Sequence, residues 1–144
     1  MHIQIVGLEI MGRKTNLPKP SGNLYSGYLP EGYISALRSG SDLIKSGDYS
    51  TAESYLTKMA FKYHDGNLLF VLFLADALFL QGRLEEAEKL YRDLIEITVF
   101  YEHPHHGLAL ILLKTNRASE AEQHIRMAKP KMGGEIPEYL PPLK

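Results

Sequence analysis

The chain has 144 residues, of which 44% are hydrophobic and 23% are charged, and this is the composition of one ordinary globular domain. Its sixteen Lys and Arg nearly balance its seventeen Asp and Glu, so a net charge of −1 provides no general attraction for nucleic acid or for a membrane surface. Because Cys is absent, disulfides, thiolate zinc sites and a cysteine nucleophile are excluded.

The first thirty residues differ from the rest of the chain. Residues 3–10 are mostly apolar but contain Glu9 and have no basic start, unlike a signal peptide. The following stretch is rich in Pro and Gly, which is typical of an extended or disordered segment. We therefore predict a flexible N-terminal lead over residues 1–30 and a cytoplasmic protein.

Six helical segments follow in chain order. The pattern of apolar and polar residues predicts helices over residues 31–45, 49–62, 67–81, 84–99, 105–115 and 118–129. Gly47, Gly82 and Asn116 fall between the members of each pair, where a left-handed backbone is favourable for Gly and tolerable for Asn. We predict a helical domain over residues 31–130 and a Pro-rich tail over residues 131–144, which either lies extended against the body or hangs free.

A short motif occurs three times along this helical region. Gly47-Asp48-Tyr49-Ser50-Thr51-Ala52-Glu53 recurs in degenerate form from Gly82 and again from Asn116, with Ala87 and Ala121 matching Ala52. A period near ~34 residues, with a turn glycine and a small residue five positions later, indicates stacked helix pairs. A single pair cannot bury its apolar face alone, so the pairs must stack.

Residues 33–130 resemble the tetratricopeptide repeat family, as about three degenerate copies. The second copy matches best, because Ala75, Gly82, Ala87 and Tyr91 occupy family positions. The usual tryptophan is absent from all three copies. The resemblance implies an all-α fold, a stack of antiparallel helix pairs with about six helices and extended or disordered termini.

In this family the first helix of each pair lines a concave face that binds ligands. The corresponding residues here are mostly apolar: Ile34, Leu37, Ser41, Ile44 and Lys45 in the first copy, Leu69, Leu72, Asp76, Phe79 and Leu80 in the second, and His103, His106, Leu110, Leu113 and Lys114 in the third. Members that bind the acidic tails of heat-shock chaperones carry Lys, Asn and Arg on this face. Leu37, Ser41 and Leu72 replace those groups, so we reject that function.

The helical segment over residues 68–80 is apolar on all sides except for Asp76. Both of its faces must therefore be covered, because a large exposed apolar patch is a binding site or an aggregation hazard. The candidate covers are a partner helix, a second copy of the chain, and the chain's own terminal segments. Asp76 itself either pairs with Lys or Arg of a partner or forms an intrachain pair, for example with Lys45 or Lys114.

Two further residue groups are candidates for a site. The cluster His103-Pro104-His105-His106 has a metal-like composition, but a zinc site needs three or four converging ligands and neighbouring side chains diverge at a helix start, so we predict surface histidines and no metal. Tyr25, Tyr28 and Tyr139 lie in the terminal segments and are candidate partner anchors or phosphorylation sites.

These patterns predict a protein-interaction module rather than an enzyme, with no cofactor. The favoured function is a small adaptor or chaperone that holds an apolar helix or extended segment of a partner protein, similar to small tetratricopeptide-like chaperones of bacterial secretion systems. The alternative is a scaffold subunit or homodimer whose groove is permanently filled. We expect no nucleic-acid partner and no membrane insertion, and a homo-oligomer is possible.

Overall fold

The computed structural model describes residues 17–22, 29–98, 101–129 and 136–143. The predictions for residues 3–10, Tyr25 and Tyr28 lie outside the described residues, and so does much of the predicted lead and part of the tail.

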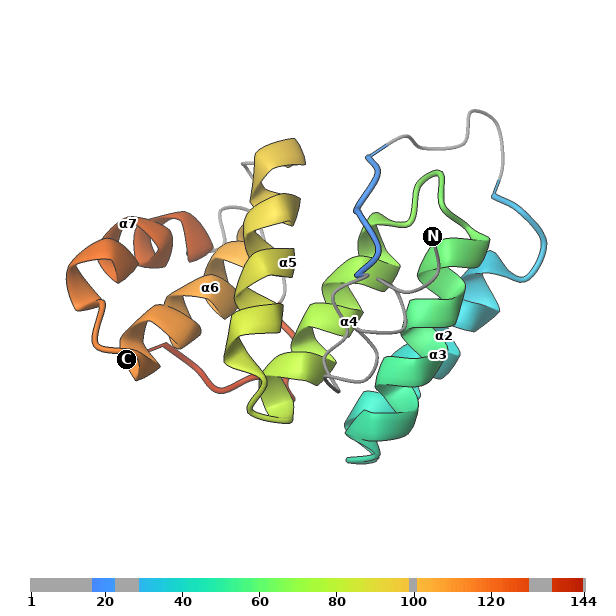
Figure 1. Ribbon diagram of the computed structural model, residues 1–144, viewed down its shortest axis with the longest axis horizontal. Helices are drawn as coiled ribbons and strands as arrows, with labels where there is room; N and C mark the ends of the chain where they lie inside the picture. The colour runs from blue at the N-terminus through green and yellow to red at the C-terminus, as the bar shows by residue number, and fades with distance from the viewer. Residues whose placement is uncertain (1–16, 23–28, 99–100, 130–135, 144) are drawn as a thin grey trace, which may run out of the picture.

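The described chain forms six helices in three antiparallel pairs, which stand side by side in a row (Figure 1). The pairs are α2 (Tyr33–Lys45) with α3 (Tyr49–Lys62), α4 (Leu68–Leu80) with α5 (Leu84–Ile97), and α6 (Glu102–Lys114) with α7 (Ala118–Ala128). The described ranges contain no strand. The predicted all-α stack of helix pairs is confirmed. None of the helices in these ranges has the length and apolar content needed to span a membrane.

The turns inside the pairs adopt the predicted left-handed backbone. Gly47, Gly82 and Asn116 have φ angles of 88°, 81° and 61°. The start of α6 is the one helix boundary predicted wrongly by more than two residues, because the helix begins at Glu102 and includes Pro104 in its first turn. Proline is compatible with that turn, since the first N–H groups of a helix have no partner inside it.

The first helices of the pairs lie against one another. The backbone of α2 contacts that of α4, and α4 contacts α6, whereas among the described residues α3 and α5 share no close backbone contact. The stack therefore curves with α2, α4 and α6 on its inner side. We call the surface formed by these three helices the first-helix face.

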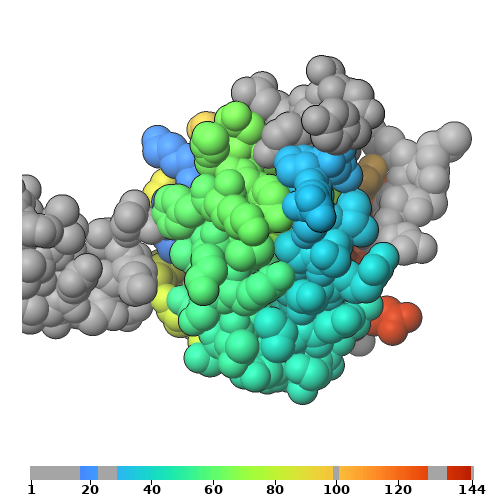
Figure 2. All heavy atoms as spheres, turned by 90° about the vertical axis from the view of Figure 1, so that its right-hand side faces the viewer, coloured from blue at the N-terminus to red at the C-terminus, as the bar shows by residue number. Residues whose placement is uncertain are grey.

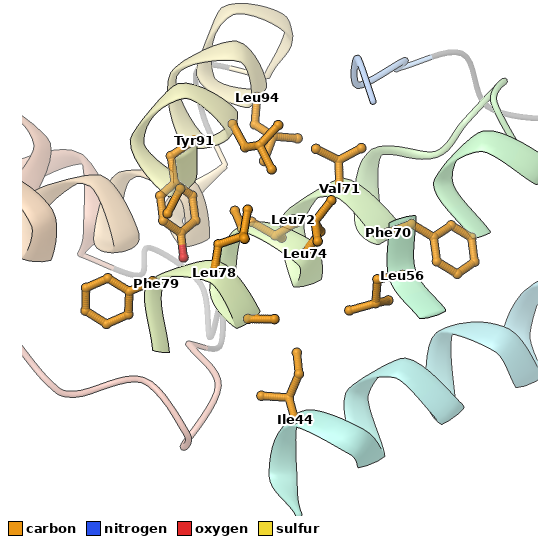
Figure 3. Packing of buried hydrophobic residues seen from close by; sticks show 14 of the residues in the cluster. Ile44, Leu56, Phe70, Val71, Leu72, Leu74, Leu78, Phe79, Tyr91 and Leu94 are labelled. Carbon is orange, nitrogen blue, oxygen red and sulfur yellow. The ribbon is translucent and has the colours of Figure 1, made fainter. Parts of the chain in front are cut away.

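Helix α4 forms the centre of the hydrophobic core. In Figure 3, Leu72, Leu74 and Leu78 of α4 lie between side chains of the first pair and those of α5. All three leucines are fully buried. Burial of one leucine side chain contributes about 1.5–3 kcal/mol, so α4 supplies much of the apolar stabilisation of the stack.

Polar side chains join consecutive pairs on the side of the second helices. Arg83, at the start of α5, binds Glu53 of α3 as well as Glu86. In the next repeat Arg117, at the start of α7, binds Glu88 of α5 at 2.7 Å. We call these two contacts the Glu–Arg clasps. The hydrogen bond from Arg117 is the main reason why the pKa of Glu88 is lowered.

Candidate functional site

The C-terminal segment 136–143 lies on the first-helix face. It contacts α4 through Tyr139 and α6 through Pro141, and its remaining apolar residues lie near α7. The red segment passes beneath α6 in Figure 1. Leu140 is only 5% exposed. Of the two alternatives left open for the tail, the described part therefore adopts the one in which it lies against the body.

Asp76 connects this segment to the helices. Its carboxylate is completely buried and accepts hydrogen bonds from the hydroxyl groups of Tyr91 on α5 and Tyr139 in the tail, the latter at 2.6 Å. The Nε2 atom of His103 on α6 lies 2.8 Å from Oδ2 and 3.1 Å from Oδ1 of the same carboxylate. A buried carboxylate is costly unless donors surround it, and three side chains supply them here.

The expected intrachain pairing of Asp76 is therefore present, but its partners are not Lys45 or Lys114, both of which are exposed. Burial and the neighbouring negative charge of Asp76 raise the pKa of both Tyr91 and Tyr139. Both hydroxyl groups consequently remain protonated at neutral pH and act as donors to the carboxylate.

The predicted surface position of the histidine cluster is wrong. His103, His105 and His106 are 3%, 3% and 6% exposed. They are buried because α6 begins early and is packed against α4, α5, α7 and the tail. Nδ1 of His105 lies 2.9 Å from Nδ1 of His124 on α7.

Each histidine of α6 has a different partner. Nε2 of His106 lies 2.7 Å from the carbonyl oxygen of Pro141, so this nitrogen carries the proton and donates it. Burial lowers the pKa of His106 and also that of His124. No group of three or more potential metal ligands occurs within the described residues.

A pocket of about 680 Å³ lies where the tail meets the last helix pair. His106 of α6 and Ile125 and Ala128 of α7 form one side, and Ile136, Leu140 and Leu143 of the tail form the other. The tail therefore covers part of α4 and α6 on the first-helix face without filling all of the apolar space beside it.

The residues predicted to bind a partner fall into three classes of exposure. Six are buried, and these are Ile44, Leu72, Asp76, Phe79, His106 and Leu110. Leu37, Leu69 and Leu80 are half-buried, whereas Ile34 and Leu113 are 49% and 39% exposed. The middle of the predicted face is thus closed by the chain itself, and its exposed apolar residues lie on the outer first helices. Helix α2 is visible at the free end of the stack in Figure 2.

The chain's own terminal segments were one of the three covers predicted for α4, and residues 136–143 take that place here, but sequence reasoning assigned no separate role to Leu140 or Pro141. Tyr139 was recognised as a candidate anchor, and its observed partner is Asp76 of the same chain. The sequence offered one signal for this contact: a single acidic residue in an otherwise apolar helix and a tyrosine in the Pro-rich tail. That signal does not state which segments meet, because 63 positions separate the two residues.

Comparison with known proteins supports the architecture. Residues 43–100 match the family model described as tetratricopeptide repeat. No curated protein sequence matches the chain significantly.

Three solved structures share the fold. The type III secretion translocator chaperone SycD of Yersinia enterocolitica has a TM-score of 0.63 at 19% identity over 69% of this chain and 75% of its own. A component of the CopN–Scc3 complex has a TM-score of 0.61 at 18% identity over 86% and 72%. MamA AMB-1 has a TM-score of 0.57 at 23% identity over 69% and 54%. At these identities the likeness concerns the fold. The predicted resemblance to the tetratricopeptide repeat family is confirmed, in sequence over residues 43–100 and in the stacking of its helix pairs.

Proposed function

We propose that this protein is a small cytoplasmic adaptor or chaperone that holds an apolar segment of a partner protein on its first-helix face and catalyses no reaction. The observation that carries the proposal is the seating of residues 136–143 on that face. A surface that accommodates a Pro-rich segment, with Leu140 almost fully buried, has the shape and apolar character needed for such a segment of another protein.

The fold gives a second line of support. SycD is a translocator chaperone, and CopN–Scc3 is a complex between two proteins. Repeats of this kind expose an extended concave surface because each unit contacts only its neighbours. A protein-binding function therefore suits the architecture of this chain better than catalysis does.

The alternative function is a scaffold subunit or homodimer whose face is permanently filled. The hydrogen bond from Tyr139 to Asp76 favours this alternative, since it fills the face from within the same chain. Under this hypothesis the tail is a fixed part of the fold and partners bind elsewhere.

Site-specific photo-crosslinking in native lysate tests the proposal. A photoreactive phenylalanine analogue is placed at Ile34 and at Leu113, the two exposed apolar residues of the predicted face. Matched controls carry it at Ser54 on α3 and Ser119 on α7, which are exposed residues of second helices. We expect adducts with another protein from the first two positions and not from the controls.

Two results would count against the adaptor. Equal adducts from all four positions would mean that the first-helix face is not the binding surface. Adducts formed only between two copies of this chain would support the homodimer instead.

A further inference from the structure

The binding surface under the tail contains a specific polar feature. Most of the contact is apolar, but the carboxylate of Asp76 lies beneath Tyr139 and accepts a hydrogen bond from its hydroxyl group, with 2.6 Å between the two oxygen atoms. The carboxylate is fully buried, whereas Tyr139 is only partly buried and belongs to a separate segment of the chain. Asp76 therefore remains part of the face whichever segment covers it.

The chemistry of a buried carboxylate restricts what can cover it. Removing the Tyr139 hydroxyl without replacement would leave Asp76 with one donor fewer in an apolar environment, and a lost hydrogen bond to a charged group is expensive. An acidic side chain at that place would be repelled by the same charge. A tyrosine fits because its ring covers apolar surface while its hydroxyl reaches the acid.

The rest of the segment also suits an apolar surface. Pro137, Pro141 and Pro142 have no backbone N–H group, so they leave fewer donors to satisfy when the segment docks. The carbonyl oxygen of Pro141 is bound by His106, and the amide of Leu140 is bound by the carbonyl oxygen of Pro137. Proline also restricts the free segment, which reduces the entropy lost on docking.

We propose that residues 136–143 are a built-in competitor for the binding site, and that the partner segment which replaces them is rich in Leu and Pro and presents a tyrosine to Asp76 from a turn like that of residues 137–140. This inference rests on the proposed function and specifies its partner. The tail reduces the apparent affinity of the partner by the fraction of molecules in which it is docked.

A peptide-binding experiment with the full chain tests the competitor directly. The probe is a fluorescent peptide with the sequence of residues 136–143, Ile-Pro-Glu-Tyr-Leu-Pro-Pro-Leu, and the readout is its dissociation constant by anisotropy. We expect Tyr139→Phe to bind the peptide roughly tenfold more tightly than the wild type, because the internal tail loses its hydrogen bond and competes less. A peptide with Phe in place of Tyr should bind that variant roughly tenfold more weakly than the original peptide.

Two further variants isolate the effect. Tyr55→Phe makes the same chemical change on α3 and should leave peptide affinity at the wild-type value. Leu140→Ser weakens the tail without altering the face and should also tighten peptide binding. Melting curves and circular dichroism establish that each variant is folded.

Either of two results would overturn the inference. One is that the wild type, Tyr139→Phe and Leu140→Ser all bind the peptide with equal affinity. The other is that the Tyr139→Phe chain binds the tyrosine peptide and the phenylalanine peptide with equal affinity. The assay needs no natural partner, so its failure leaves the crosslinking result standing. Tight, tyrosine-dependent peptide binding without any crosslinked protein would instead contradict the proposed function and leave the competitor in place.

Discussion

Gly107 on α6 lies against the aromatic ring of Tyr91 on α5. A Cβ atom at this position would overlap the aromatic ring of Tyr91 from α5. That ring is fully buried and its hydroxyl group is bound to Asp76, so it has little freedom to move aside. The absence of a side chain at Gly107 therefore allows Tyr91 to reach the carboxylate.

We expect Gly107→Ala to lower the free energy of unfolding by about 1–3 kcal/mol, the usual cost of overpacking a core. Gly40→Ala is the matched comparison, because its Cβ would meet the terminal methyl and branch carbons of Leu56, which can rotate. Urea denaturation of both variants measures the difference. An equal loss at the two positions would show that the Tyr91 ring is not rigidly held.

The histidines of the last helix pair give stability that depends on pH. Burial is the main cause of the lowered pKa of His106 and of His124, so the folded chain binds fewer protons here than the unfolded chain does. Their contribution is present above the unfolded pKa of about 6.5 and is lost as the pH falls below it.

We therefore expect the melting temperature to fall between pH 7 and pH 5. His124→Gln should flatten this part of the profile, because it removes one of the two groups and its contact with His105. The lowered pKa of Glu88 acts in a separate window, since its contribution is lost only below the unfolded pKa of about 4.5. A melting temperature that is constant down to pH 5 would contradict the histidine account.

At the scale of helices, the Glu–Arg clasps join pairs whose described second helices share no close backbone contact. Glu53 and Arg83 are partly exposed, so their attraction is modest and is screened by salt. We expect Glu53→Gln to lower the melting temperature in low salt and the difference from wild type to shrink in 1 M salt. Asp93→Asn breaks a pair with Lys89 inside α5 alone and serves as the control. A larger effect of Asp93→Asn than of Glu53→Gln would contradict a role in joining the pairs.

The helices were predictable because their signals are local. Turn residues such as Gly82 and small residues such as Ala87 recur with the repeat, and they fixed the helix pairs and their order. The start of α6 was predicted wrongly because of Pro104. A proline can precede a helix or occupy its first turn, and the sequence alone does not distinguish the two cases. The seating of Tyr139 could not be predicted, because it depends on which distant surface the stack presents to the tail.

At the scale of the whole molecule, the tail determines how much apolar surface reaches water. Leu140→Asp should release it from the face, because a charge cannot remain in the space where that leucine is 5% exposed. We expect increased binding of a hydrophobic dye with unchanged helical circular dichroism. Pro142→Asp, at an exposed position of the same segment, should have a smaller effect. Equal dye binding by both variants would mean that Leu140 does not hold the tail.

The order of the chain gives this arrangement a consequence during translation. The docking surface of the tail consists of residues from α4, α6 and α7, and all three helices precede residues 136–143. The helices of the binding surface are therefore synthesised before the segment that covers them. A partner that is present at that moment meets an open site, whereas one that arrives later must first displace a segment already in place.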